Sequence, residues 1–267
     1  MIDKEKLKRR FSRNARQYDK YAKVQKNMGD ILIEKIKSTK TQYKNILEIG
    51  CGTGYVTKAL CEHFKNSNIT AIDIAPGMIS HVKSKISDTR VGFICGDVEE
   101  MDFDKDFDLI LSNAAFQWFN NLENTFKKLV KTLAPKGFMC FSTFGENTFI
   151  ELKKCYEKTS SYFGIKDTIY PSQPFLSLKD YKKICSGILD KSHTLSLMET
   201  YEYEYFNCCK DFLYSIKKIG ANNSQKRSNI VHPNFIDKVI NTYDKDYRKD
   251  NKVLATYHNL FVFISKD

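Results

Sequence analysis

The sequence has few of the residue patterns that mark a metal centre or a disulfide scaffold. Its 267 residues include eight cysteines, but none of them forms a Cys-x-x-Cys pair, and Cys208 and Cys209 are adjacent. The five histidines are scattered, with no His-x-x-x-His spacing. Because structural zinc sites use paired Cys or His ligands at such spacings, we expect no metal, and we expect the thiols to be reduced.

A long apolar run is also missing. No segment approaches the roughly 20 apolar residues that a helix needs to cross a bilayer. The first residues, MIDKEKLKRRFSR, are charged where a signal peptide would need an apolar segment. With 42% hydrophobic and 13% aromatic residues, the chain can still form a packed core. These observations predict a folded cytoplasmic protein that makes no use of a membrane.

Negative charge is scarce near the N-terminus. The chain has a net charge of +11, and residues 1–26 hold ten Lys and Arg against three Asp and Glu, which is +7 of that total. A basic run of this kind is either a solvated helix face or a surface for an acidic partner. Both interpretations stay open at this point.

Helical periodicity extends over the same N-terminal segment. Residues at steps of three and four define one face of a helix whose other face is Lys and Arg. This face consists of Leu7, Phe11, Ala15, Tyr18, Ala22 and Gln25. A second helical stretch is expected at about residues 28–37.

Between residues 45 and 144, short apolar runs alternate with amphipathic segments. The runs are NILEI, NITAIDI, VGFICGD, FDLILSN and FMCFSTF. Buried runs of this length separated by helices are typical of βαβ units with a parallel sheet. They predict five strands by residue 144.

The rhythm changes after residue 145. A helix is expected over 146–163, then a loop with Pro171 and Pro174, the alternating segment HTLSLMETYEYEYF, helices at about 209–219 and 233–242, and a terminal strand. The pattern predicts an α/β fold with a doubly wound, mostly parallel seven-stranded sheet, an antiparallel C-terminal strand and a helical insertion after strand five.

We expect a single domain over residues 1–267. Within it, the expected parts are an N-terminal helical arm or lid (1–40), a cofactor-binding core (41–144), a substrate-recognition insertion (145–253) and a final strand (254–267).

The first expected strand runs directly into three glycines, in NILEIGCGTGYVTKAL. Glycines at Gly50, Gly52 and Gly54 allow a tight turn and a close approach of a ligand to the backbone. In nicotinamide sites the third glycine comes one residue later, so that a pyrophosphate can sit on the helix N-terminus; Tyr55 stands there in this chain. The spacing instead suits a nucleoside without phosphate, with Glu48 facing a positively charged amino-acid group.

Carboxylates follow the next two expected strands. Asp73 ends the second strand, where a carboxylate can accept both ribose hydroxyls, and Asp97 follows the third, placed to accept from an adenine amino group. Either residue alone could merely cap the next helix. A glycine turn and two acids at three successive strand ends together indicate a nucleoside pocket.

Over about residues 45–144, including LAPKG before the fifth strand, the sequence resembles the class I S-adenosylmethionine-dependent methyltransferases. The resemblance implies S-adenosylmethionine as methyl donor, S-adenosylhomocysteine as product, and no metal. The cofactor-binding residues that it implies are Gln25, Glu48, Gly50, Cys51, Gly52, Gly54, Asp73, Ile74, Asp97, Val98 and Asn113.

Three further stretches carry a more specific resemblance. They are FSRNARQYDKYAKVQ, NAAFQWFNNL with FSTFGENTFIEL, and DFLYSIKKIGANN with ATYHNLFVFISK. They resemble the malonyl-[acyl-carrier protein] O-methyltransferases of biotin synthesis. This implies methylation of the free carboxylate of a malonyl thioester, on an acidic acyl carrier protein or on coenzyme A, to give the methyl ester that primes pimeloyl and biotin synthesis. Lys8, Arg9 and Arg10 would then face the carrier.

Residues for the methyl acceptor are less well marked. The candidates for positioning it are Tyr18, Gln117, Trp118, Phe144 and Arg227. A desolvated carboxylate needs a cation, for which Arg227 is preferred over Lys217 and His232, although Arg227 could also be an exposed loop charge. Trp118 could equally be a core residue.

Three other functions were weighed against this one. SNAAFQW lacks the Asn-Pro-Pro-Tyr or Asp-Pro-Pro-Tyr of enzymes that methylate base amino groups, which disfavours a nucleic-acid methylase. A methyltransferase of the same fold that acts on another small carboxylate or on a quinone stays open. So does a non-catalytic nucleoside-binding protein, although the intact set of pocket residues argues against it.

Overall fold

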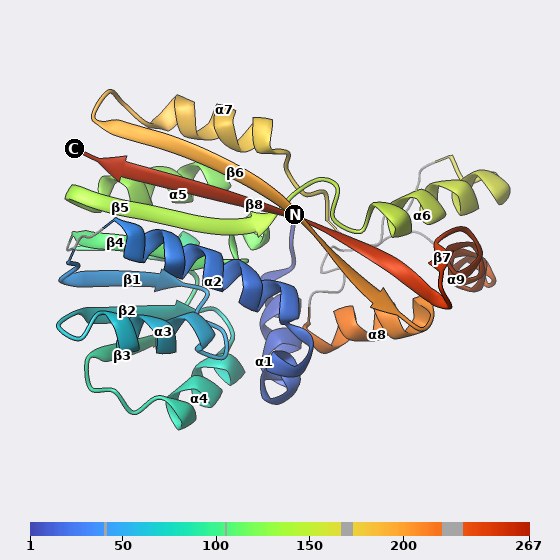
Figure 1. The fold of residues 1–267 in the computed structure, drawn as a ribbon, viewed down its shortest axis with the longest axis horizontal. Coiled ribbons are helices and arrows are strands. Elements are labelled where there is room, and N and C mark those ends of the chain that lie inside the picture. Colours follow the sequence, from blue (N-terminus) through green and yellow to red (C-terminus); the bar gives the residue numbers. More distant parts are fainter. Residues whose placement is uncertain (40–41, 105, 167–172, 221–231) are drawn as a thin grey trace.

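The computed structural model describes residues 1–39, 42–104, 106–166, 173–220 and 232–267, and its centre is one twisted sheet (Figure 1). The strands are β1 (Asn45–Ile49), β2 (Asn68–Asp73), β3 (Val91–Cys95), β4 (Phe107–Asn113), β5 (Leu133–Phe144), β6 (His193–Phe206), β7 (Arg248–Lys249) and β8 (Lys252–Lys266). Their order across the sheet is β3-β2-β1-β4-β5-β8-β6, with the short β7 paired to β8.

Strand directions follow the expected doubly wound pattern. β1 to β5 pair in parallel, whereas β8 is antiparallel to both β5 and β6 and therefore runs against them. The expectation of a mostly parallel sheet with an antiparallel C-terminal strand is confirmed. Because β1, β2 and β4 are parallel neighbours, their carboxyl ends meet at one edge of the sheet, where such folds bind ligands.

Both faces of the central strands β1 and β4 are buried, which explains why these strands are continuous apolar runs, whereas the edge strands β3 and β6 are only partly buried. Leu109 and Leu111 of β4 enter one core, and Ile110 between them enters the other. The helices are α1 (Lys4–Tyr21), α2 (Lys23–Ser38), α3 (Tyr55–His63), α4 (Pro76–Lys85), α5 (Leu122–Lys131), α6 (Ile150–Tyr162), α7 (Leu178–Ile188), α8 (Cys209–Lys218) and α9 (Phe235–Asp246). Helices α2, α3 and α4 contribute to the first core, and α5 and α7 contribute to the second.

The strands β6 and β8 form a long antiparallel ribbon that extends past the end of β5 (Figure 1). Helices α6, α8 and α9 pack around this extension and add their apolar side chains to the first core. Helix α1 packs against α4 and α8, and so connects the extension with the part of the fold around α4. Among the described residues, no helix is long and apolar enough to span a membrane.

Two helices differ from the sequence-based expectation. One continuous helical face was expected from Leu7 to Gln25. The chain instead leaves the helical conformation at Ala22 (φ −90°, ψ 46°), which separates α1 from α2. Helix α7 lies in a stretch where only a loop was expected. Its start is a capping box in which Ser177 Oγ accepts from the Asp180 backbone N–H and the Asp180 carboxylate accepts from the Ser177 N–H.

Candidate functional site

The glycine turn after β1 is held against the end of β2. The backbone N–H groups of Gly50 and Cys51 both donate to the Ile72 carbonyl, at 2.8 and 3.0 Å. Gly50 and Gly52 have φ of +73° and +53°, a region that favours glycine. A Cβ on Gly50 would lie 2.6 Å from the Cβ of Ala115. The turn therefore brings main chain, rather than side chains, to the carboxyl edge of the sheet.

Gly54 has a different role in the turn. Its φ is +87°, and a Cβ there would lie 2.4 Å from Cγ2 of Val82 in α4. It lines neither of the pockets described below. Gly54 allows the start of α3 to pack closely against α4, which fixes the helix that follows the turn.

Two pockets meet at this turn, and they share Tyr18, Gly50, Gly52 and Asn113. The first pocket is lined by Lys4, Leu7, Phe11, Tyr18, Ile49, Gly50, Gly52, Ile72, Asp73, Ile74, Met78, Gly96, Asp97, Val98, Asn113, Ala114, Ala115, Trp118 and Phe119. The second is lined by Tyr18, Asp19, Ala22, Gln25, Lys26, Glu48, Gly50, Cys51, Gly52, Thr53, Tyr55, Val56 and Asn113.

Asp73 lies at the boundary between turn and first pocket and is 9% exposed. Its Oδ2 accepts from the Gly52 N–H at 2.9 Å, and its Oδ1 accepts from the Ala75 N–H at 2.8 Å. Burial raises the pKa of Asp73 to about 6, against the lowering effect of these two bonds. A carboxylate has about four lone-pair sites, so Asp73 can accept two further hydrogen bonds, as a ribose diol requires.

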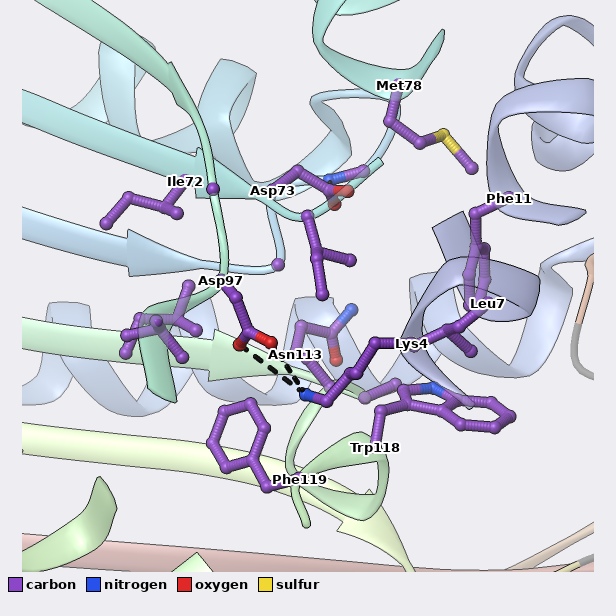
Figure 2. A pocket seen from close by; sticks show the side chains of 18 of the residues that line it. Lys4, Leu7, Phe11, Ile72, Asp73, Met78, Asp97, Asn113, Trp118 and Phe119 are labelled. Carbon is purple, nitrogen blue, oxygen red and sulfur yellow. Dashed lines mark hydrogen bonds and ion pairs between the residues drawn. The ribbon is translucent and has the colours of Figure 1, made fainter. Parts of the chain in front are cut away.

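Asp97 sits on the other side of the first pocket. Its Oδ1 accepts from the Glu99 N–H at 3.1 Å and so caps the short helix η1 (Val98–Glu100). It also faces a cation from α1: Lys4 Nζ lies 3.2 Å from Asp97 Oδ2 and pairs with Glu99 as well. Figure 2 shows Lys4 reaching across the pocket to Asp97 beside Trp118 and Phe119.

The walls of the first pocket are apolar. Trp118, at the end of η2 (Phe116–Trp118), is 9% exposed, and its ring meets Phe11 edge to face with centroids 5.7 Å apart. Met78 (Figure 2) and Ile74 line the same pocket. The two interpretations of Trp118 thus hold together, because it lines the pocket and also packs against Leu7 of α1. An apolar slot with carboxylates at its ends suits a flat, polar-edged base.

Gln117 and Phe144 line neither pocket. Gln117 Nε2 donates to the Ala114 carbonyl at 2.7 Å, and its Oε1 accepts from Thr143 Oγ1 at 2.9 Å. Ala114 has a φ of +52°, so Gln117 supports a left-handed turn directly after β4. Phe144 is buried, with its ring centroid about 6 Å from that of Tyr257.

The second pocket contains a buried carboxyl group. Glu48 is 2% exposed, and its Oε2 has no hydrogen-bond partner among the described residues. Burial raises the pKa of Glu48 to about 8. Because a buried oxygen without a donor is costly, this site fits a ligand that brings a donor, such as the ammonium of the expected S-adenosylmethionine.

Asn113 connects the second pocket to the helices above it. Its Nδ2 donates to the Gln25 carbonyl at 2.8 Å, and its Oδ1 accepts from Ser142 Oγ at 2.6 Å. Tyr18, from α1, lines both pockets, and burial raises the pKa of its hydroxyl, which stays neutral at pH 7. Cys51 lines the second pocket, and Ile74 and Val98 line the first.

Of the expected cations for an acceptor carboxylate, Lys217 and His232 line neither pocket. Arg227 lies outside the described residues. Lys217 is exposed on α8, and the ring of His232 stacks on Phe163 with centroids 4.2 Å apart. Over the described part of the chain, no cluster of three or more His, Cys, Asp or Glu side chains could hold a metal ion.

Several residues that line the pockets were not predicted. Lys4, Met78 and Phe119 line the first pocket, and Asp19 and Lys26 line the second. Leu7 and Phe11 also line the first pocket. Both lie on the apolar face predicted for the N-terminal helix, so this face was the signal from which they could have been inferred. Nothing in the sequence separates Lys4 and Lys26 from the many solvated lysines around them.

Comparison with known proteins agrees with this geometry. The family described as "Methyltransferase domain" matches residues 46–137. A malonyl-[acyl-carrier protein] O-methyltransferase of Priestia megaterium is 45% identical, over 100% of this chain and 99% of the relative. A protein of the same name from Acetivibrio thermocellus is 42% identical, over 98% of this chain and 94% of the relative.

Solved structures show the same fold at low sequence identity. A putative methyltransferase from Bacillus halodurans superposes with a TM-score of 0.61 at 13% identity, covering 88% of this chain and 98% of that one. The plantazolicin methyltransferase BpumL, in complex with a pentazolic desmethylPZN analog and SAH, gives a TM-score of 0.56 at 16% identity, covering 99% of this chain and 96% of that one.

Proposed function

The chain belongs to the malonyl-[acyl-carrier protein] O-methyltransferase family, and from this premise we propose that it methylates the free carboxylate of a malonyl thioester held by an acyl carrier protein. S-adenosylmethionine is the methyl donor. The observation that carries the proposal is the pair of pockets that meet at the glycine turn, one with Asp73 and Asp97 and the other with Glu48. The carboxylates of the first pocket match the polar groups of a nucleoside, and the carboxyl group of the second matches an amino-acid group.

Each end of the donor has its own residues in this arrangement. Asp73 would hold the ribose hydroxyls, Trp118 with Ile74 and Met78 would enclose the base, and Asp97 would accept from its amino group. Glu48 holds the ammonium in the second pocket. When bound, S-adenosylmethionine supplies a methyl group on a positively charged sulfur, which a nucleophile can displace in line.

The acceptor does not need a base from the protein. A carboxylate is already ionised at pH 7, so the protein has only to orient it and remove its water. We assign Tyr18 to this task, because it lines both pockets and its neutral hydroxyl can donate a hydrogen bond to a carboxylate. Gln117 supports the Ala114 turn from behind.

The proposed reaction is tested by methyl transfer from labelled S-adenosylmethionine. Malonyl-carrier protein, malonyl-coenzyme A and free malonate are offered in parallel, with a saturated acyl-carrier protein as a control that has no free carboxylate. The malonyl thioesters should be labelled and the saturated carrier should not. Transfer only to another small carboxylate or to a quinone would overturn the assignment of substrate.

Cofactor affinity should depend on pH through Glu48. With a pKa of about 8, Glu48 is neutral at pH 6, and it becomes the ionised partner of an ammonium as pH rises. Below that pKa the ionised fraction grows about tenfold per pH unit, so the affinity for S-adenosylhomocysteine should rise about tenfold from pH 6 to 7. Asp73, with a pKa of about 6, adds less than about twofold over this range.

Calorimetry at pH 6, 6.5 and 7 measures this slope. Glu48→Gln keeps the shape of the side chain but has no charge to titrate, so its affinity should be lower and should change no more than about twofold over the range. A slope that persists in Glu48→Gln would assign the titration to another group.

Docking of the carrier protein is assigned to the basic face of α1. Lys8 pairs with Glu5 of the same helix, at 2.8 Å, and Arg9 is exposed. Reversing both charges (Lys8→Glu with Arg9→Glu) should raise the KM for malonyl-carrier protein roughly tenfold, because an acidic partner would be repelled. The KM for malonyl-coenzyme A and the Kd for S-adenosylhomocysteine should change much less.

A matched control changes the same number of charges elsewhere. Lys245→Glu with Lys249→Glu alters two exposed positions at the end of α9 and in β7. This control should leave the KM for the carrier-bound substrate near that of the wild type. Equal effects of both double variants would indicate a response to net charge rather than a docking face.

A further inference from the structure

Two charged side chains that line the second pocket can still bind a ligand. Asp19, Lys26 and Glu48 are the charged residues that line it. Asp19 is already engaged, because its Oδ1 accepts from Thr53 Oγ1 at 2.5 Å and its Oδ2 pairs with Lys85 Nζ at 3.0 Å. Glu48 and Lys26 are therefore the two charged residues that can bind a ligand, one as a carboxylate and one as an ammonium. They line the pocket that we assign to a zwitterionic amino-acid group.

Lys26 is held at this pocket by a backbone carbonyl, and its charge acts on the Asp19 carboxylate only at a distance, helping to lower the pKa of Asp19. Its Nζ donates to the Asp19 backbone carbonyl at 2.7 Å and lies 5.6 Å from the centre of the Tyr55 ring. Among the described residues, no carboxylate lies within ion-pair distance of this nitrogen. A lysine ammonium has three N–H donors, so two of them are available for a ligand.

The backbone next to Lys26 is fixed as well. The Gln25 carbonyl accepts from Asn113 Nδ2 at 2.8 Å, which ties the first turn of α2 to the end of β4. The Tyr55 hydroxyl donates to Asp30 at 2.9 Å, which holds the ring beneath the ammonium. Lys26 is therefore prepared to receive an anion with little further ordering, a condition that favours binding.

We propose that Lys26 binds the carboxylate of the cofactor's amino-acid group while Glu48 binds its ammonium. This inference rests on the proposed function, since it names the ligand groups of the same pocket. Together the two residues distinguish a full zwitterion from nucleosides that lack either charge. Lys26 is thus a specificity-determining residue for S-adenosylmethionine and S-adenosylhomocysteine.

Three ligands distinguish carboxylate binding by Lys26 from a general effect of Lys26 on the pocket. S-adenosylhomocysteine carries both charges, its decarboxylated analogue keeps only the ammonium, and methylthioadenosine keeps neither. Losing a hydrogen bond to a charged group weakens binding by roughly 10- to 100-fold. Calorimetry should show a loss of this size for Lys26→Met with S-adenosylhomocysteine, and no change with the other two ligands. Lys26→Arg, which keeps the charge, should recover most of the affinity.

Two further variants complete the comparison. Glu48→Gln should weaken binding of the two ligands with an ammonium and leave methylthioadenosine unchanged. Lys58→Met removes an exposed charge from α3 near the glycine turn, outside both pockets, and should affect none of the ligands. Unchanged affinity of Lys26→Met for S-adenosylhomocysteine, or an equal loss for all three ligands, would overturn the inference. If the wild-type protein bound none of them, the proposed function itself would fail.

Discussion

Replacing Asp73 with alanine is expected to weaken binding of S-adenosylhomocysteine at least a hundredfold. Each hydrogen bond from a ribose hydroxyl to the carboxylate is worth roughly 1.5–3 kcal/mol, and two are lost together. The variant also leaves the N–H groups of Gly52 and Ala75 without their acceptor. Titration calorimetry with S-adenosylhomocysteine measures the loss, and a melting curve shows whether the fold persists.

Asp108 offers a matched control for this substitution. Its Oδ2 accepts from the backbone N–H groups of Lys44 and Asn45 at 2.8 and 2.7 Å, so it also satisfies two main-chain donors. It does so at the amino end of β1, at the opposite edge of the sheet from the pockets. Asp108→Ala should cost stability without changing affinity. If Asp73→Ala and Asp108→Ala lost the same affinity for S-adenosylhomocysteine, the role of Asp73 would be structural and not ligand binding.

Gly50→Ala is expected to abolish measurable cofactor binding and activity. A Cβ at this position would lie 2.6 Å from the Cβ of Ala115, and the φ of +73° is unfavourable for alanine. To avoid this contact, either the glycine turn or the chain after β4 must move. Gly50 in the turn lines both pockets and Ala115 after β4 lines the first, so either movement distorts the site. Methyl transfer and calorimetry with S-adenosylhomocysteine should both fall below detection.

Gly187 in α7 is the corresponding control. A Cβ there meets nothing within 4 Å, and alanine favours a helix over glycine by roughly 1 kcal/mol. Gly187→Ala should keep full activity and raise the melting temperature slightly. A Gly50→Ala protein that still bound S-adenosylhomocysteine with wild-type affinity would show that close approach of the backbone is not required.

The sequence predicted the sheet well because its signal is local and repeated. Each strand from β1 to β5 contains a short apolar run between amphipathic segments, and β1 and β4 are buried on both faces. The break at Ala22 could not be predicted, since no glycine or proline marks it and periodicity continues across it. The start of α7 did carry a signal, the Ser177-x-x-Asp180 spacing, but its two flanking prolines favoured a loop.

For the site, the sequence could single out the residues whose type is demanded by backbone or ligand chemistry. Gly50, Gly52, Glu48 and Asp73 are of this kind, and all of them line the pockets. Lys4 and Lys26 could not be found in this way, because their place depends on how α1 and α2 pack over the sheet. A lysine at the pocket and one in solvent look the same in a sequence with 43 Lys and Arg.

The interruption at Ala22 gives the two pockets separate helical covers. Leu7, Phe11 and Lys4 line the first pocket from α1, whereas Gln25 and Lys26 line the second from α2. On the proposed function, release from the first pocket would require α1 to move, and the break at Ala22 would let it do so without unwinding α2. We therefore expect exit to be sequential, with the base uncovered first and the zwitterionic tail let go last.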